Sequence, residues 1–336
     1  MASISFSIFI YFLFLFLLLF KSKKGKHDNK EYFFYAFNNL RGLFALEIIV
    51  GHVVRYESTL LYPMGKFMII SVAYFFFVSA FGLVRSFHQK ENYLYRFLIR
   101  KCPYLVMIAS ITFFIRTLLF ICLNADNSGQ NIFWLLIRQI NWYIYELLLF
   151  YILFYFVYKY LRKYRITVIT MVTLIFITYA YYSGMIEAYY ASALAFPAGL
   201  LFYEHFESIS NFLSSVWGKV FVILITVVGL SSLLLDSDSL IGMVYLRNII
   251  CIAGLCILFY FLTYFTVGNN LLKILGKYST ELYLYQFIFL DLTVSLTDYR
   301  IRMCLVCGLT GLTAIVICPL NQAIRRWLEK LSSANS

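Results

Sequence analysis

The sequence predicts an all-α, polytopic integral membrane protein with about eleven transmembrane helices. Of its 336 residues, 62% are hydrophobic and only 13% are charged, whereas a soluble domain is about half apolar and about a quarter charged. A soluble core cannot bury such a surplus, but a bilayer accepts apolar side chains on the outside of every helix. With 4 prolines and 16 glycines in the whole chain, long linkers are not expected.

Apolar runs long enough to cross the hydrocarbon core as helices, about 20 residues each, recur along the chain. They predict ten core helices and one extra N-terminal helix. The seventh, eighth and tenth runs are short for a full crossing. The expected spans are 2–20, 33–54, 64–84, 103–123, 142–158, 166–184, 189–204, 219–235, 244–266, 281–297 and 303–323.

Three segments follow from these spans. Residues 1–31 form the extra helix and a basic cytoplasmic linker, residues 32–326 form the membrane domain, and residues 327–336 form a short tail. The basic run follows the first apolar stretch instead of preceding it, which is the reverse of a signal peptide. This order predicts an uncleaved helix with its N-terminus outside.

The net charge of +12 is explained by topology. In a soluble protein it would suggest nucleic-acid binding, but here most basic residues fall in alternate connections between apolar runs. If residues 21–31 are cytoplasmic, these basic connections all lie on the cytoplasmic side. The connections on the outer side carry acidic residues instead. The positive-inside rule then places the C-terminus in the cytoplasm of a plasma-membrane protein. We expect the lipid bilayer as a partner and no nucleic acid.

Ionisable residues inside expected spans indicate function or a buried partner, because they are costly in a bilayer. Arg41 and His52 are 11 residues apart on one expected helix, so they point to the same side at depths about 16 Å apart. They could hold one long ligand. Alternatively, Arg41 pairs with Glu47 or Glu146 and His52 bonds to a neighbouring helix.

Other polar residues in the spans fit structural roles better. Glu47 lies about 140° round the helix from His52, which favours a salt bridge to another helix. Together with Arg116 and Glu146 it is a candidate for intramembrane polar support. The Cys304–Cys307 pair has no second pair of matching spacing, so packing is the preferred interpretation and we expect no metal site.

The stretch 39–52, Asn-Leu-Arg-Gly-Leu-Phe-Ala-Leu-Glu-Ile-Ile-Val-Gly-His, resembles the first core helix of the acyltransferase-3 family of membrane O-acyltransferases. That family has an L-R-G-L-x-A-L stretch with ten residues between Arg and His, and both positions match. Residues 74–82 resemble its F-F-V-L-S-G-F helix, with Ala80 in place of the usual Gly.

Three further segments resemble the family in the same order. Residues 96–103 are similar to its basic R-R-x-x-R-x-x-P segment, and residues 141–146 to its W-F-x-x-x-L helix. Residues 276–286 resemble its G-x-x-S-Y-x-x-Y-L-x-H motif, but Gln286 stands where His is common. No acid or base role is therefore carried over to Gln286. The resemblance covers residues 36–323.

The resemblance implies transfer of an acyl group, usually acetyl, from acyl-CoA to a hydroxyl of a cell-envelope or secreted polysaccharide or its lipid-linked precursor. No permanently bound cofactor is expected, since acyl-CoA is a co-substrate. His52 would act as general base with Arg41 as its companion. Arg96, Arg100 and Lys101 would meet the coenzyme-A phosphates, or alternatively contact lipid phosphates.

Histidine positions also favour His52 as the base. His27 and His88 are expected in loops and His205 at a helix end, which leaves His52 alone inside a core helix. The alternative function is a multi-pass transporter or flippase of a glycan or small anionic solute, since transporters also bury such residues. A transporter would favour internal repeats and broken helices, and the sequence has no evident repeat.

Overall fold

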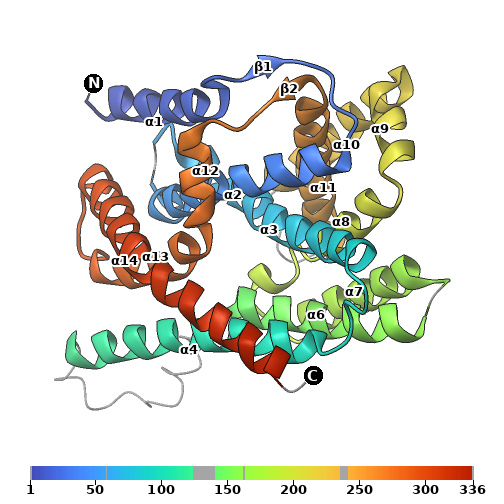
Figure 1. Cartoon of the computed structure of the whole chain (residues 1–336). Helices are drawn as coiled ribbons and strands as arrows, with labels where there is room; N and C mark the ends of the chain where they lie inside the picture. The colour runs from blue at the N-terminus through green and yellow to red at the C-terminus, as the bar shows by residue number, and fades with distance from the viewer. Residues whose placement is uncertain (1, 58, 124–140, 162, 235–240, 335–336) are drawn as a thin grey trace.

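The structure is a computed structural model that describes residues 2–57, 59–123, 141–161, 163–234 and 241–334 (Figure 1). Within these ranges the chain forms thirteen α-helices, one 3-10 helix and two strands of two residues each. Seven helices are long and apolar enough to cross a membrane. The all-α, multi-pass architecture predicted from composition is confirmed, whereas the count of eleven spans is not.

The seven long helices lie where apolar runs predicted spans. Two of these helices, those beginning at Lys30 and Trp142, are capped by an asparagine side chain. Asn29 accepts a hydrogen bond from the Glu31 amide, and Asn141 accepts one from the Ile144 amide. These bonds satisfy N–H groups that have no partner within the first turn of a helix. The bounds of the seven long helices are α2 Lys30–Val54, α3 Tyr62–Gln89, α4 Phe97–Leu123, α6 Trp142–Tyr160, α7 Arg165–Tyr182, α11 Ile241–Tyr264 and α14 Tyr299–Ala334.

Four expected spans take other forms. The first is the shorter apolar helix α1 (Ala2–Leu19), and the tenth is α13 (Ser279–Leu292), which follows a separate helix α12 (Asn270–Lys277). The remaining two, 189–204 and 219–235, differ more. Apolar content marks their positions, but breaks in the helical backbone shorten them.

The eighth expected span is bent. Helices α9 (Phe206–Ser214) and α10 (Val216–Leu234) meet at 87°. A Cβ atom at Gly218 would lie 1.9 Å from the Phe212 carbonyl oxygen, so only glycine permits this corner. The Gly218 amide also donates to the Ser215 hydroxyl at 3.0 Å, which caps the new helix.

The seventh expected span is half irregular. A 3-10 helix, η1 (Glu187–Tyr189), precedes the short helix α8 (Ala195–Glu204). The buried Asn248 of α11 clamps the segment between them, accepting from the Leu194 amide at 3.0 Å and donating to the Tyr190 carbonyl at 2.7 Å. These bonds satisfy backbone groups that the broken helix leaves open.

Helix α2 lies at the centre of the fold and packs against α3, α12, α13 and α14. Its approach to α12 is close, because a Cβ on Gly42 would lie 2.2 Å from the Leu275 carbonyl carbon and one on Gly276 would lie 2.4 Å from the Asn38 carbonyl oxygen. Two glycines therefore set the distance between these helices. The position of α2 brings Arg41 and His52 into contact range of several elements.

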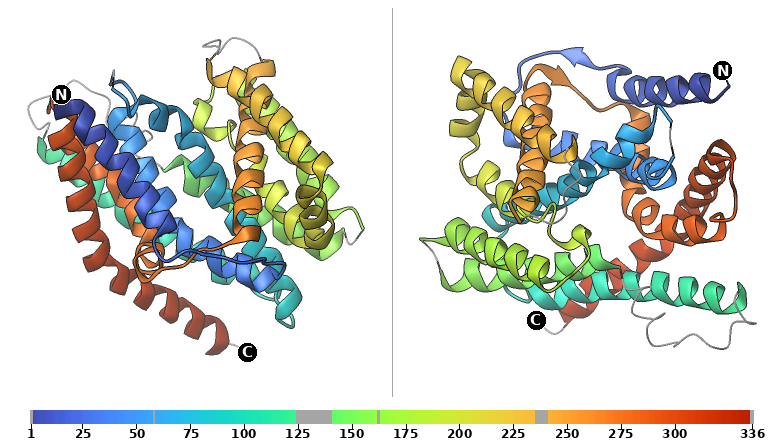
Figure 2. Two further views of the ribbon diagram at one scale, coloured as in Figure 1. Left: turned by 90° about the horizontal axis from the view of Figure 1, so that it is seen from above. Right: turned by 180° about the vertical axis from the view of Figure 1, so that it is seen from behind.

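The extra N-terminal helix joins distant parts of the chain (Figure 2). Near its start, the Ser3 and Tyr299 hydroxyls are 2.8 Å apart at the beginning of α14. At its other end, Asn269 donates to the Phe20 carbonyl at 3.0 Å. The following strand β1 (Lys23–Lys24) pairs antiparallel with β2 (Phe265–Thr266). Helix α1 thus extends from the start of α14 to the start of α12.

Candidate functional site

Arg41 and His52 belong to one unbroken helix, α2, as the sequence predicted. The Arg41 Nη1 atom lies 3.5 Å from the Asn38 amide oxygen, a long contact. Its Nε atom is buried and has no hydrogen-bond partner among the described residues. Within the same residues Arg41 forms no ion pair with Glu47 or Glu146, so the alternative that predicted such a pair is wrong for this part of the chain.

Four tyrosine hydroxyls lie within electrostatic range of the Arg41 guanidinium. Its charge acts on four phenol groups that come from α3, α4 and α6. Phenols offer both donor and acceptor positions, while an arginine offers five donors in a planar fork. The arrangement suits an acceptor-rich, elongated ligand. The four residues are Tyr74, Tyr104, Tyr143 and Tyr151.

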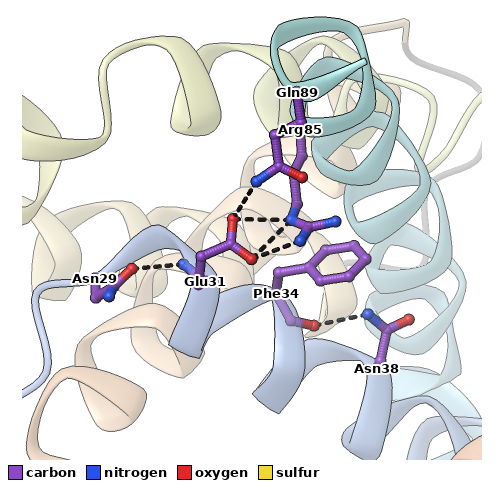
Figure 3. A network of polar contacts seen from close by, with 6 residues as sticks. All are labelled: Asn29, Glu31, Phe34, Asn38, Arg85 and Gln89. Atoms are coloured by element: carbon purple, nitrogen blue, oxygen red, sulfur yellow. Dashed lines mark hydrogen bonds and ion pairs between the residues drawn. The ribbon is translucent and has the colours of Figure 1, made fainter.

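A polar network fixes the start of α2 relative to the end of α3 (Figure 3). Arg85 donates to both carboxylate oxygens of Glu31, the shorter contact being 2.6 Å, and Gln89 donates to the same carboxylate at 2.7 Å. The Arg85 guanidinium also lies 4.2 Å from the centre of the Phe34 ring. One turn further, Asn38 donates to the Phe34 carbonyl. Asn38 also contacts Arg41, so this network extends to the candidate site.

His52 lies near the other end of α2 and contacts α13. Its ring meets Phe287 edge to face, with 5.3 Å between centroids. Phe287 also contacts Arg116, whose guanidinium is 5.5 Å from the ring centre and whose Nε donates to Asp291 at 2.7 Å. Arg116 therefore supports the ring that contacts His52, which agrees with a role in polar support.

His88 does not lie in a loop. It occupies the last turn of α3, where its Nε2 atom is 3.0 Å from a carboxylate oxygen of Glu204. Helix α3 continues to Gln89, beyond the expected end of its apolar run at residue 84. His52 is accordingly one of two histidines on the long core helices, and the one without a carboxylate partner among the described residues.

Aromatic rings connect the His52 end of the site to α6. Phe287 and Tyr283 of α13 are 6.1 Å apart between centroids, and Tyr283 is 4.9 Å from Tyr143. Tyr143 also feels the charge of Arg41. The site residues of α2 therefore face one continuous group of aromatic side chains.

The two intramembrane glutamates differ in their contacts. The Glu47 carboxyl interacts with the Ser71 hydroxyl of α3, and the salt bridge expected for it is not formed with any described residue. Glu146 is 1% exposed, and neither carboxyl oxygen has a hydrogen-bond partner in the described part of the chain. Glu47 thus agrees with the expected support role through its contact with the Ser71 hydroxyl. For Glu146 the described residues supply no hydrogen-bond donor.

The basic cluster begins α4, as Arg96, Arg100 and Lys101 occupy the junction and first turns of this helix. Arg96 has a φ of 55°, a left-handed conformation that is uncommon for a residue with a side chain. Arg100 donates to the carbonyls of Tyr93 and Tyr95, at 2.8 and 2.9 Å. Part of the Arg100 guanidinium therefore holds the loop that carries Arg96.

An open, mainly apolar hollow of about 560 Å³ lies beside Arg96. Its lining combines the α3–α4 junction with two residues of α6, Tyr155 and Lys159. Burial raises the pKa of the neighbouring Tyr93 to about 12, so its phenol stays neutral. The basic cluster is thus built on a folded loop and borders a hollow.

Arg325 of α14 was not predicted as a site residue. Its positive charge lies within electrostatic range of Tyr93, Tyr104 and Tyr151. Tyr104 and Tyr151 are also within range of the Arg41 charge. A basic pair near the chain end was the only sequence signal. The contact of α14 with α4, which spacing along the chain could not reveal, brings Arg325 to the cluster.

Gln286 stands where the resemblance suggested a histidine. It is fully buried, and its amide nitrogen donates to the Tyr283 carbonyl one turn back. Its amide oxygen has no partner among the described residues. The side chain thus bonds within its own helix.

The chain is all-helical and multi-pass, and one core helix carries both an imidazole and a guanidinium. A family model described as an acyltransferase domain, that of the acyltransferase-3 family, matches residues 34–321. The match covers most of the chain, so the protein belongs to this family and is a membrane acyltransferase. Comparison with curated proteins and with solved structures found no match.

Proposed function

We propose that the protein transfers an acyl group, with acetyl as the first to test, from cytosolic acyl-CoA to a hydroxyl of a cell-envelope or secreted polysaccharide or its lipid-linked precursor. The observation that carries this proposal is that Arg41 and His52 lie on one helix and face one continuous group of aromatic rings. The basic cluster suits a phosphate-bearing donor, and the imidazole suits activation of a hydroxyl.

The donor would enter at the start of α4. Arg96 and Lys101 supply cations there, and the neighbouring Arg325 adds a third from α14. Arg100 contributes by holding the loop through the carbonyls of Tyr93 and Tyr95. The pantetheine arm would then extend along α2, where Arg41 binds it or the thioester carbonyl with donors that match acceptor oxygens.

The transfer step requires only groups that are present. A ring nitrogen of neutral His52 takes the proton of the acceptor hydroxyl while that oxygen attacks the thioester carbonyl carbon. The tetrahedral oxyanion collapses, the C–S bond breaks, and the coenzyme-A thiolate leaves and takes the proton from His52. An ester and a free thiol are the products.

The proposed topology has eleven crossings, with the N-terminus outside and the C-terminus in the cytoplasm of the plasma membrane. Long-range contacts support the alternation, because each joins residues that this topology assigns to one side. Lys23 pairs with Thr266 on the inner side, and His88 pairs with Glu204 there. Ser3 meets Tyr299 on the outer side.

Purified protein in liposomes tests the function directly. We would add acetyl-CoA labelled in the acetyl group and octyl β-glucoside as a hydroxylated acceptor. Formation of an acetyl ester in equal amount to released coenzyme-A thiol is the expected result. Movement of the glucoside across the bilayer without ester formation would favour a transporter or flippase instead.

A further inference from the structure

Glu146 is a buried carboxyl for which the described residues supply no hydrogen-bond donor. It is 1% exposed, and both of its oxygens are without a partner in that part of the chain. A carboxylate in an apolar environment is strongly unfavourable unless donors surround it. Among the described residues, both oxygens are therefore open to hydrogen bonds from a molecule that binds beside Glu146.

A second glutamate provides the contrast. Glu281 of α13 is 3% exposed, and the Asn321 amide of α14 donates to it at 2.9 Å. The fold thus supplies a donor to one buried carboxyl and none to the other. Structural support explains Glu281 but leaves Glu146 unexplained.

Aromatic rings from three elements lie within electrostatic range of Glu146. Its charge acts on Tyr143 of α6, Tyr189 of η1 and Tyr283 of α13. Tyr189 is 5.9 Å from Trp142 between centroids, and Tyr143 is 4.9 Å from Tyr283. Flat rings with one carboxylate among them form the kind of mainly apolar site that orients a ligand through a few polar contacts.

The irregular segment around η1 is the second sign of a binding site. Asn248 fixes this segment, and Arg247 holds its Glu187 at 2.5 Å. Loop segments that a rigid scaffold holds in place often carry binding residues. The segment lies against the start of α6, near Glu146, and it presents Tyr189 there.

We propose that Glu146 binds the acceptor, accepting hydrogen bonds from neighbouring hydroxyls of a sugar whose ring lies against Tyr189 and Tyr283. A carboxyl group presents two oxygens side by side that can accept hydrogen bonds, so vicinal hydroxyls match it. Tyr283 also contacts Phe287, the ring that meets His52. The sugar would thereby have another hydroxyl near the base. This inference rests on the proposed function and assigns its acceptor subsite.

The test measures acceptor and donor binding separately. Purified wild type and Glu146→Gln in liposomes receive labelled acetyl-CoA and increasing octyl β-glucoside, and acetyl-CoA affinity is measured without acceptor. Replacing one carboxyl oxygen with an amide nitrogen, which cannot accept a hydrogen bond, should raise the KM for octyl β-glucoside about 10- to 100-fold. The dissociation constant of acetyl-CoA should stay within about twofold. The matched control Glu281→Gln, which keeps its Asn321 contact, should change neither value.

A second variant covers the case in which Glu146→Gln does not fold. Tyr189→Ala removes a half-buried ring outside the long helices and should also raise the KM for octyl β-glucoside with acetyl-CoA affinity unchanged. A probe with one hydroxyl, octyl tetraethylene glycol ether, should be a poor acceptor for the wild type and should respond little to either substitution.

The outcomes separate this inference from the proposed function. If wild type neither binds acetyl-CoA nor forms an ester, the proposed function fails. If wild type is active and folded Glu146→Gln or Tyr189→Ala keeps its acceptor KM, only the acceptor subsite is overturned. Weaker acetyl-CoA binding in Glu146→Gln would likewise overturn it, because the carboxyl would then serve the donor.

Discussion

The imidazole of His52 meets the Phe287 ring edge to face, with 5.3 Å between the ring centroids. This contact joins α2, which carries both proposed reacting groups, to α13. A ring edge restricts the orientation of the imidazole without using either nitrogen. This contact therefore occupies neither nitrogen of His52, as the proposed proton transfer requires.

Substitution of His52 tests its role as base. His52→Ala should lower acyl transfer by about 10²- to 10⁴-fold, the usual effect of losing a positioned base. Acetyl-CoA binding and thermal unfolding should change little, because the imidazole packs against α13 only through the edge of one ring. Phe287→Leu, which keeps the imidazole, should reduce turnover much less. Near-normal turnover by folded His52→Ala protein would eliminate the mechanism.

The Arg41 guanidinium should not be replaceable by an ammonium group. Arg41→Lys keeps the charge but loses the planar fork of donors that a guanidinium presents. We expect transfer to fall at least about tenfold, as for loss of a charge-assisted hydrogen bond of about 1.5–3 kcal/mol. Isothermal titration with acetyl-CoA and turnover measurements would separate donor binding from catalysis. Equal activity of Arg41→Lys and wild type would contradict this role.

Local patterns in the sequence were enough to predict much of the fold. The apolar runs marked all seven long helices, and the 11-residue spacing of Arg41 and His52 correctly implied one helix face. These local patterns did not predict the break before α8 or the 87° corner between α9 and α10. Those depend on the Asn248 clamp and on the close approach at Gly218, which are tertiary contacts.

The candidate site was predictable only where one helix carries it. Arg41, His52 and the α4 cluster were found by spacing and charge. Arg325 joins the cluster because α14 packs against α4, and the unpartnered state of Glu146 depends on the residues that surround it in space. Sequence spacing holds no information on either contact.

Arg96 and Arg100 should differ in what their substitution changes. Arg96→Glu should weaken acetyl-CoA binding by about tenfold or more, with little loss of thermal stability. Arg100→Glu should do both, because two loop carbonyls lose their donor. The control Lys163→Glu reverses an exposed charge in another inner loop. Equal acetyl-CoA affinity in Arg96→Glu and Lys163→Glu would reassign the cluster to lipid contact.

Reporter fusions test the topology. Fusions after Lys26, after Lys163 and at the end of the chain should all report cytoplasm, whereas one after Glu57 should report the outside. The expectation follows from the distribution of basic residues and from the same-side contacts of β1 with β2 and of His88 with Glu204. An outside signal after Lys26 together with a cytoplasmic signal at the chain end would contradict this topology. It would mean that the chain crosses the membrane an odd number of times between these two points, whereas the topology requires an even number.

The Arg116–Asp291 pair should couple stability to activity. Their 2.7 Å contact joins α4 to α13, and the Arg116 guanidinium lies 5.5 Å from the Phe287 ring. Asp291→Asn leaves a guanidinium without its ion-pair partner beside that ring, and an unpaired charge within the membrane is costly. We expect lower thermal stability and turnover reduced by a few-fold.

The double-mutant cycle gives the decisive comparison. Arg116→Met combined with Asp291→Asn removes both charges, so the destabilisation of the single variants should be partly reversed, with a coupling of about 0.5–3 kcal/mol. Thermal unfolding of purified protein measures the recovery. Turnover should also recover if the pair acts by orienting Phe287 against His52. Strictly additive effects would mean that the two side chains contribute independently and that Phe287 is held by α13 alone.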